Sequence, residues 1–214
     1  MVKKLIMIIL MLIPLAGCYD NQQMGDIVIV SGVGIDADGD KFLVSAELVK
    51  MSPGEEGESG MKAVVISSEG DTVTEALDDI TRKTSGNLHF NHCRVVLIGE
   101  SAARSGIDFA IDLILQDFDF HTSSGIVIAR GAPASEILSG KPENQSTMAY
   151  EISKMLSVNQ TDMQMRMKTP VIDFNNCAHG SDKHAVFPAV SKNGEGVKLN
   201  GAAFFTGTRL EYFR

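Results

Sequence analysis

The spacing of apolar residues changes from segment to segment along this chain, and short β-branched or alternating runs predict strands. The clearest alternation lies in 41–49, where every second residue from Phe42 to Leu48 is apolar. A β-branched run at 27–30 precedes it and is expected to end at Ser31, with a polar turn at 36–40 between the two strands. The same criteria predict strands at 63–66, 94–98, 124–129, 185–190 and 199–205, the last two separated by a turn at 193–196.

Apolar residues three and four positions apart predict helices. In 72–83 such a series follows Thr72 and Glu75, which form a capping box at the start of the expected helix. The same spacing predicts helices at 107–118, 134–138 and 147–158, and a further helix is considered at 171–177. Segment 52–60 contains Gly, Glu, Ser and one Pro without an apolar residue, and it is expected to be a mobile loop within the domain.

Strands and helices alternate along most of the chain. This order predicts an α/β fold, with a mixed α+β arrangement as the alternative, in which helices flank a central mixed sheet. The chain has 214 residues, of which 44% are hydrophobic and 21% charged, a composition typical of a globular protein with a core. We expect one domain over 27–214.

The N-terminal segment has the pattern of a signal peptide. Lys3 and Lys4 precede an apolar run at 5–15, which is shorter than the roughly 20 residues that span a bilayer. The small residues Ala16 and Gly17 follow it directly. The sequence therefore predicts a signal peptide over 1–17.

The four residues that end this segment, Leu15-Ala16-Gly17-Cys18, resemble the lipobox of bacterial lipoproteins. That resemblance implies cleavage between Gly17 and Cys18 and a diacylglycerol on the Cys18 thiol; an ordinary signal peptide with a chance cysteine is the alternative. A two-chain lipid anchors a protein durably, because each buried methylene contributes about 0.8 kcal/mol. Residues 18–26 would then form a short tether outside the cytoplasm.

The charge balance limits the partners. Without 1–17 the chain keeps 17 of its 19 basic residues and all 27 acidic ones, a net charge of −10. No basic patch is available for nucleic acid, and anionic headgroups would repel the protein, so membrane attachment is expected to depend on the lipid.

His89, His92 and Cys93 are close enough in sequence to suggest a metal site. We expect a strand here, on which His92 and Cys93 would point to opposite faces, so no metal is predicted and none is needed as a cofactor. Cys93 and Cys177 could pair in an oxidising compartment, but two separate buried thiols are the preferred interpretation.

Two sequence patterns within 32–41 partly match known ligand-binding motifs. The acids at 36, 38 and 40 resemble the first ligands of an EF-hand loop, but Lys41 occupies the position where an EF-hand needs glycine. Gly32 and Gly34 approximate a dinucleotide-binding spacing, yet a strand rather than a helix is expected to follow them. A hairpin turn is the preferred interpretation of both.

Catalytic residues are not predicted. The chain contains serines at 31, 123 and 124 and histidines at 179 and 184, but no Gly-x-Ser-x-Gly nucleophile elbow. The sequence therefore predicts a protein that is not an enzyme.

Several ordered segments resemble the Ger(x)C family of spore germination lipoproteins. They are the lipobox with Cys18-Tyr19-Asp20, where the family has Trp before Asp, and the blocks 30–36, 92–100, 128–133 and 137–138. Segment 201–205 resembles the strand that precedes two further domains in this family, so the chain is expected to be its N-terminal domain in a truncated form, which would fold but not restore germination alone.

The resemblance implies a subunit without catalytic activity, the C subunit of a nutrient germinant receptor. It would lie on the outer face of the spore inner membrane, anchored by the lipid on Cys18, and would bind the integral membrane A and B subunits. The alternative is an extracytoplasmic lipoprotein that binds a small ligand for a transporter.

Overall fold

The computed structural model describes residues 27–51, 61–84, 86–109, 120, 124–162 and 184–214. The expected signal peptide, Cys18, the tether, the 52–60 loop and the 171–177 helix lie outside these residues. Of the helix expected at 107–118, residues 107–109 are described, and Asp108 and Phe109 among them are helical.

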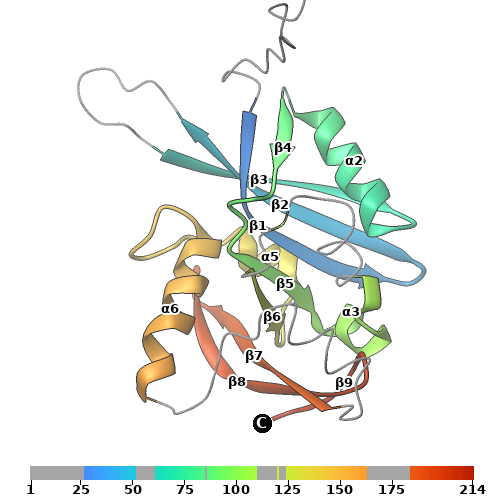
Figure 1. Ribbon diagram of the computed structural model, residues 1–214, viewed down its shortest axis with the longest axis vertical. Helices are drawn as coiled ribbons and strands as arrows, with labels where there is room; N and C mark the ends of the chain where they lie inside the picture. Colours follow the sequence, from blue (N-terminus) through green and yellow to red (C-terminus); the bar gives the residue numbers. More distant parts are fainter. Residues whose placement is uncertain (1–26, 52–60, 85, 110–119, 121–123, 163–183) are drawn as a thin grey trace, which may run out of the picture.

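A single mixed sheet organises the described residues (Figure 1). Its strands follow the order β3-β2-β1-β5-β6-β7-β8-β9, and β4 pairs with the start of β1. Strands β1, β5, β6 and β7 are mutually parallel, whereas the hairpins at both edges are antiparallel. The expected central mixed sheet with flanking helices is therefore confirmed. The strands are β1 (Ile27–Asp38), β2 (Lys41–Met51), β3 (Met61–Gly70), β4 (Asn87–His89), β5 (Val95–Gly99), β6 (Gly125–Ala129), β7 (His184–Asn193), β8 (Gly196–Thr206) and β9 (Arg209–Phe213).

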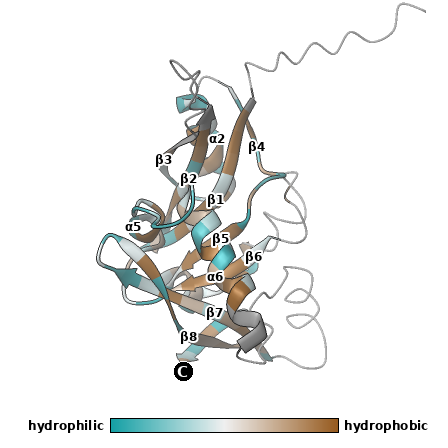
Figure 2. Cartoon of the chain, turned by 90° about the vertical axis from the view of Figure 1, so that its left-hand side faces the viewer, coloured by the Kyte–Doolittle hydropathy of each residue, from teal (hydrophilic) through white to brown (hydrophobic). Residues whose placement is uncertain are grey.

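Helices cover the two faces of this sheet. Those in the described residues are α2 (Val73–Lys83), α3 (Glu100–Ser105), α5 (Ala134–Leu138) and α6 (Met148–Asp162). The first core contains buried residues of α2 and α3, and the second contains those of α5 and α6, so each pair of helices covers its own face. Figure 2 shows that the strands between these layers are mainly hydrophobic.

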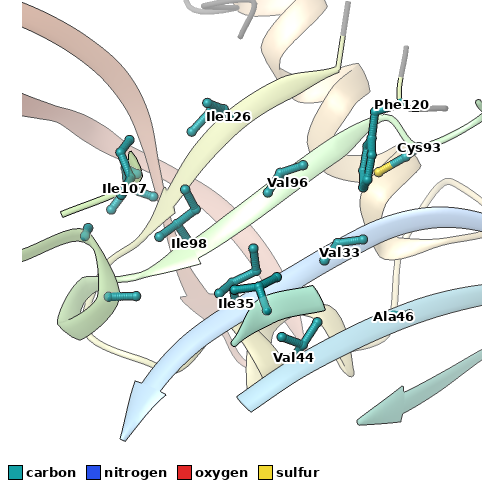
Figure 3. Close-up of a cluster of buried hydrophobic side chains, with 14 of the residues drawn as sticks. Val33, Ile35, Val44, Ala46, Cys93, Val96, Ile98, Ile107, Phe120 and Ile126 are labelled. Carbon is teal, nitrogen blue, oxygen red and sulfur yellow. The ribbon is translucent and has the colours of Figure 1, made fainter. Parts of the chain in front are cut away.

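The first core is built from alternate residues of the central strands. Figure 3 shows Val33, Ile35, Val96, Ile98 and Ile126 gathered in one cluster, and all five are fully buried. Burial of such a side chain contributes about 1.5–3 kcal/mol.

Strand β1 is longer than the sequence predicted. It continues past Ser31 to Asp38, because β2 pairs with it along nearly its whole length. The pairing shifts between Val30 and Gly32, which leaves Ser31 as an extra residue in a β-bulge. The bulge lets Val30 and Val33 both reach the first core. The expected turn follows at Gly39, whose φ of 61° suits glycine.

The capping box of α2 is confirmed with one difference. The Thr72 hydroxyl accepts the backbone N–H of Glu75 at 3.1 Å. The Glu75 carboxylate accepts the N–H of Asp71, one residue before the cap, at 2.9 Å.

The expected elements at 134–138, 147–158, 185–190 and 199–205 are present as α5, α6, β7 and β8, the last three with longer bounds. The sequence did not predict β4, α3 or β9, which are all short.

Candidate functional site

The connections that follow two adjacent parallel strands diverge at one edge of the sheet. After β5 the chain enters α3 on the first face, whereas after β6 it enters α5 on the second face. Ligands of α/β proteins bind in the crevice that such a divergence opens at the carboxyl ends of the strands. A pocket of about 550 Å³ lies at this place, and we call it the carboxyl-edge pocket. Its lining comprises Asp36, Ala37, Asp38, Lys41, Phe42, Leu43, Glu69, Glu100, Ser101, Gly131, Ala132, Pro133 and Ser135.

Glycines in β1 allow the helices of the second face to approach this strand. A Cβ at Gly32 would lie 2.5 Å from the Cβ of Ala149, near the start of α6. A Cβ at Gly34 would lie 3.3 Å from the carbonyl carbon of Ala134, at the start of α5. The two glycines therefore serve helix packing.

Asp36 caps α5 from the neighbouring strand. Its Oδ1 accepts the N–H of Ala134 at 2.7 Å, and its Oδ2 accepts the N–H of Ser135 at 2.9 Å. A Cβ at Gly99 would lie 2.1 Å from Oδ1, so glycine at 99 provides the space for this carboxylate. Pro133, which precedes α5, makes no side-chain cap, and Asp36 satisfies N–H groups that the helix itself leaves without acceptors.

Glu47 has the same role for α6. Its side chain is 1% exposed and accepts the N–H of Met148 at 2.6 Å and that of Ala149 at 3.0 Å. The Ser31 hydroxyl, at the bulge of β1, donates to the same carboxylate at 2.8 Å. Burial raises the pKa of Glu47, and the hydrogen bonds from Ala149, Ser31 and Met148 oppose this rise.

Sequence reasoning missed both of these carboxylates. It assigned Asp36 to the turn, and it gave Glu47 no structural role. The sequence feature that could have indicated helices packed closely on β1 is the pair Gly32 and Gly34, because two glycines on one face of a strand indicate close approach of another backbone.

The floor of the carboxyl-edge pocket is one face of the hairpin. Asp36, Leu43 and Glu69 are paired across β1, β2 and β3, and Asp38 is paired with Lys41. Because side chains alternate along a strand, these five residues share the face on which α5 lies.

The first turn of α3 forms a wall of the pocket. The Ser101 hydroxyl donates to the carbonyl of Ala37 at 2.9 Å, and the Glu100 carboxylate accepts from Arg104 at 2.7 Å. The Ser101 hydrogen bond therefore ties the first turn of α3 to β1. Acidic residues outnumber basic ones in the lining of the pocket.

The histidines and the cysteine near 89–93 do not form one strand. His89 ends β4, His92 is exposed in a turn, and Cys93 is buried before β5. The prediction that they alternate along a strand is therefore wrong, because the chain turns at 91–92. Burial raises the pKa of Cys93 to about 12. The described residues hold no group of three or more His, Cys, Asp or Glu that could bind a metal ion.

Other residues from the sequence analysis have structural roles or lie outside the described chain. The Ser124 hydroxyl donates to the carbonyl of Cys93 at 2.7 Å, and His184 is exposed at the start of β7. Gly17, Cys18, Cys177 and His179 are not among the described residues. No helix in the described ranges is both long and apolar enough to span a bilayer.

The sequence model of the family "Spore germination protein N-terminal domain" matches residues 20–192. The chain belongs to this family. The match runs from β1 into β7 and includes every residue that lines the carboxyl-edge pocket. It confirms the resemblance on which the sequence analysis relied.

Similar proteins with this domain include spore germination protein KC of Bacillus subtilis (strain 168), 29% identical over 92% of this chain and 51% of its own length. The putative spore germination protein YfkR of the same organism is 28% identical over 97% and 56%. Spore germination protein GerQC of Bacillus cereus is 23% identical, also over 97% and 56%. The chain thus spans about half the length of these curated relatives. A crystal structure of the GerBC protein shares 19% identity, with a TM-score of 0.35 over 86% of this chain and 51% of that one.

Proposed function

We propose that this chain is a lipid-anchored subunit of a nutrient germinant receptor and acts in spore germination by binding proteins. The observation that carries the proposal is the family match over 20–192, because the relatives that share this domain are named as spore germination proteins. In this proposal the lipid on Cys18 holds the domain on the outer face of the spore inner membrane. Its partners there are the integral membrane A and B subunits.

The described residues support binding rather than catalysis. The buried carboxylates of Asp36 and Glu47 accept backbone N–H groups, and the hydroxyl of Ser31 donates to Glu47. These groups are used to hold α5 and α6 in place. Confinement to a membrane raises the effective concentration of neighbours in that membrane, so individually weak contacts suffice for assembly.

Replacement of the anchor residue tests this proposal. The variant Cys18→Ala should leave the membrane fraction of spores and should weaken germination in response to nutrients, while a trigger that bypasses the receptors stays effective. The variant Asn21→Ala, in the expected tether, is the matched control and should behave like the parent. Unchanged membrane partitioning of Cys18→Ala would refute the anchor, and equal loss of both germination responses would refute a role at the receptor.

The transporter alternative predicts a different result. If the domain delivers a small ligand to a transporter, the Cys18→Ala variant should reduce uptake of that ligand and should leave the nutrient response of the spores intact.

A further inference from the structure

We propose that the carboxyl-edge pocket binds a small organic cation, a primary ammonium group carried on a compact apolar body. This inference goes beyond the proposed function, and it does not depend on how the domain is anchored or which subunits it contacts. It rests on the place of the pocket in the fold, on its size and on the charges that its lining leaves uncompensated.

The pocket occupies the position where open α/β sheets bind ligands. The connections after β5 and β6 leave toward opposite faces of the sheet, and the pocket lies between the segments that follow these strands. Its volume of about 550 Å³ falls within the range of roughly 300–1,000 Å³ that is usual for small-molecule sites. A ligand here would therefore be a small molecule.

Two of the four acids in the lining already accept hydrogen bonds that compensate their charge, and a third acid lies near a lysine. Asp36 accepts two backbone N–H groups of α5, and Glu100 accepts from Arg104. Asp38 and Lys41 are neighbours across the end of the hairpin, so their opposite charges offset each other in part, although the described residues show no ion pair between them. These groups reduce the net charge at their positions.

Glu69 is the fourth acid of the lining, and its cross-strand neighbour is apolar. It lies on the same face as Leu43, its partner across β2 and β3, and it is exposed at the pocket. Within the described ranges, no cationic side chain is within ion-pair distance of its carboxylate. A cation in the pocket would supply the missing positive charge.

Apolar residues share the pocket lining with this carboxylate. Leu43 is half-buried beside Glu69, and Ala132 and Pro133 line the pocket from the loop after β6. Phe42 also contributes to the lining, but its side chain packs against the first core on the other face of the sheet. The pocket therefore combines a net negative charge with apolar surface, which fits an ammonium group on an apolar body.

The test compares three probes with the same aromatic body and different charge: 2-phenylethylamine, 2-phenylethanol and 3-phenylpropanoate. Each is titrated into the full chain in detergent at low ionic strength, and saturation-transfer NMR gives the dissociation constants. The amine should bind about fivefold more tightly than the alcohol, the scale of one favourable ion pair at a partly exposed site, and the carboxylate most weakly. Physiological salt should reduce the advantage of the amine.

Variants assign this advantage to the pocket. Glu69→Gln should remove most of the difference between amine and alcohol, and Asp38→Asn should reduce it less. Glu195→Gln is the control, because Glu195 is also an exposed acid but lies at a separate surface pocket and pairs with Lys141. Glu69 is exposed, so its replacement should leave the unfolding midpoint unchanged. The proposal is overturned if the alcohol or the carboxylate binds as tightly as the amine, if none of the three binds, or if Glu69→Gln leaves the advantage intact.

Discussion

Two regions of the sheet depart from the usual separation of polar and apolar residues, and they do so in opposite ways. On β1 and β2 the acids Asp36 and Glu47 are buried, at 8% and 1% exposure. On β8 and β9 aromatic residues reach the surface, since Tyr212 is 55% exposed and its ring stacks on Phe204 at a centroid distance of 4.8 Å. A buried polar group and an exposed apolar group each call for an explanation, whereas the reverse cases do not.

The two regions differ in what their unusual residues contribute to stability. The buried acids are fully engaged with the N–H groups of α5 and α6, so their removal leaves buried donors without acceptors. Tyr212 lies on an edge strand, and removal of its ring exposes little that was buried before. Stability should therefore depend strongly on the first region and weakly on the second.

The largest effect is expected for Glu47→Ala. The change leaves the N–H groups of Met148 and Ala149 and the hydroxyl of Ser31 without their acceptor, and it should reduce the free energy of unfolding by about 3 kcal/mol. Urea denaturation followed by circular dichroism measures it, with Glu69→Ala as the exposed control. A loss below about 0.5 kcal/mol would show that Glu47 does not hold α6.

A slightly smaller effect is expected for Gly32→Ala, because the new Cβ would lie 2.5 Å from the Cβ of Ala149. The overlap should cost about 2 kcal/mol in the same unfolding experiment. The double variant Gly32→Ala with Ala149→Gly moves the methyl group from the helix to the strand and should regain part of this loss. Strictly additive losses in the double variant would argue against the contact.

Two acids should give opposite dependences of stability on pH. The pKa of Glu47 is raised by burial, so its contribution to stability is complete below its ordinary pKa of 4.5 and declines as the pH rises through the raised value. The hydrogen bond from Lys83, followed by that from Ser68, lowers the pKa of Asp79 to about 2, so its contribution is present above 3.8 and is lost as the pH falls toward 2.

Urea midpoints measured across this pH range, with Glu47→Gln and Asp79→Asn as the two variants, check these signs. Relative to the parent, Glu47→Gln should become less destabilising as the pH rises, and Asp79→Asn should become less destabilising as the pH falls. If both variants follow the same trend, the assignment of one acid as buried and the other as a surface partner of Lys83 is incorrect.

The smallest effect is expected for Tyr212→Ser, which should change the free energy of unfolding by less than about 0.5 kcal/mol. Thermal unfolding is sensitive enough to detect it. A loss as large as that of Glu47→Ala would mean that the aromatic pair of β8 and β9 is part of the core.

The same two regions show what could be predicted from the sequence. The strand at 41–49 was recognised because its apolar residues alternate, the strands at 185–190 and 199–205 because apolar runs flank a polar turn, and α2 because Thr72 and Glu75 cap it. Local patterns of this kind depend on neighbours in sequence, which the sequence displays directly.

The contacts that build the candidate site join residues far apart in the chain and were not predicted. Asp36 binds α5 nearly a hundred residues later, and no local pattern indicates which helix will lie above it. Strand β9 was missed because it is short and two of its five residues are charged, and it is ordered by pairing with β8. The pocket at the carboxyl edge also required the strand order, since its lining comes from β1, β2 and β3 and from the segments that follow β5 and β6.

The central claim, that this chain works at a membrane receptor by binding proteins, is tested most directly by crosslinking in intact spores. An epitope-tagged chain with Cys18 in place is crosslinked, solubilised and purified, and mass spectrometry identifies the proteins attached to it. The account predicts that integral membrane subunits of a germinant receptor are attached, and that Cys18→Ala abolishes their recovery. Recovery of a transporter alone, or of the receptor subunits in equal amounts with Cys18→Ala, would contradict it.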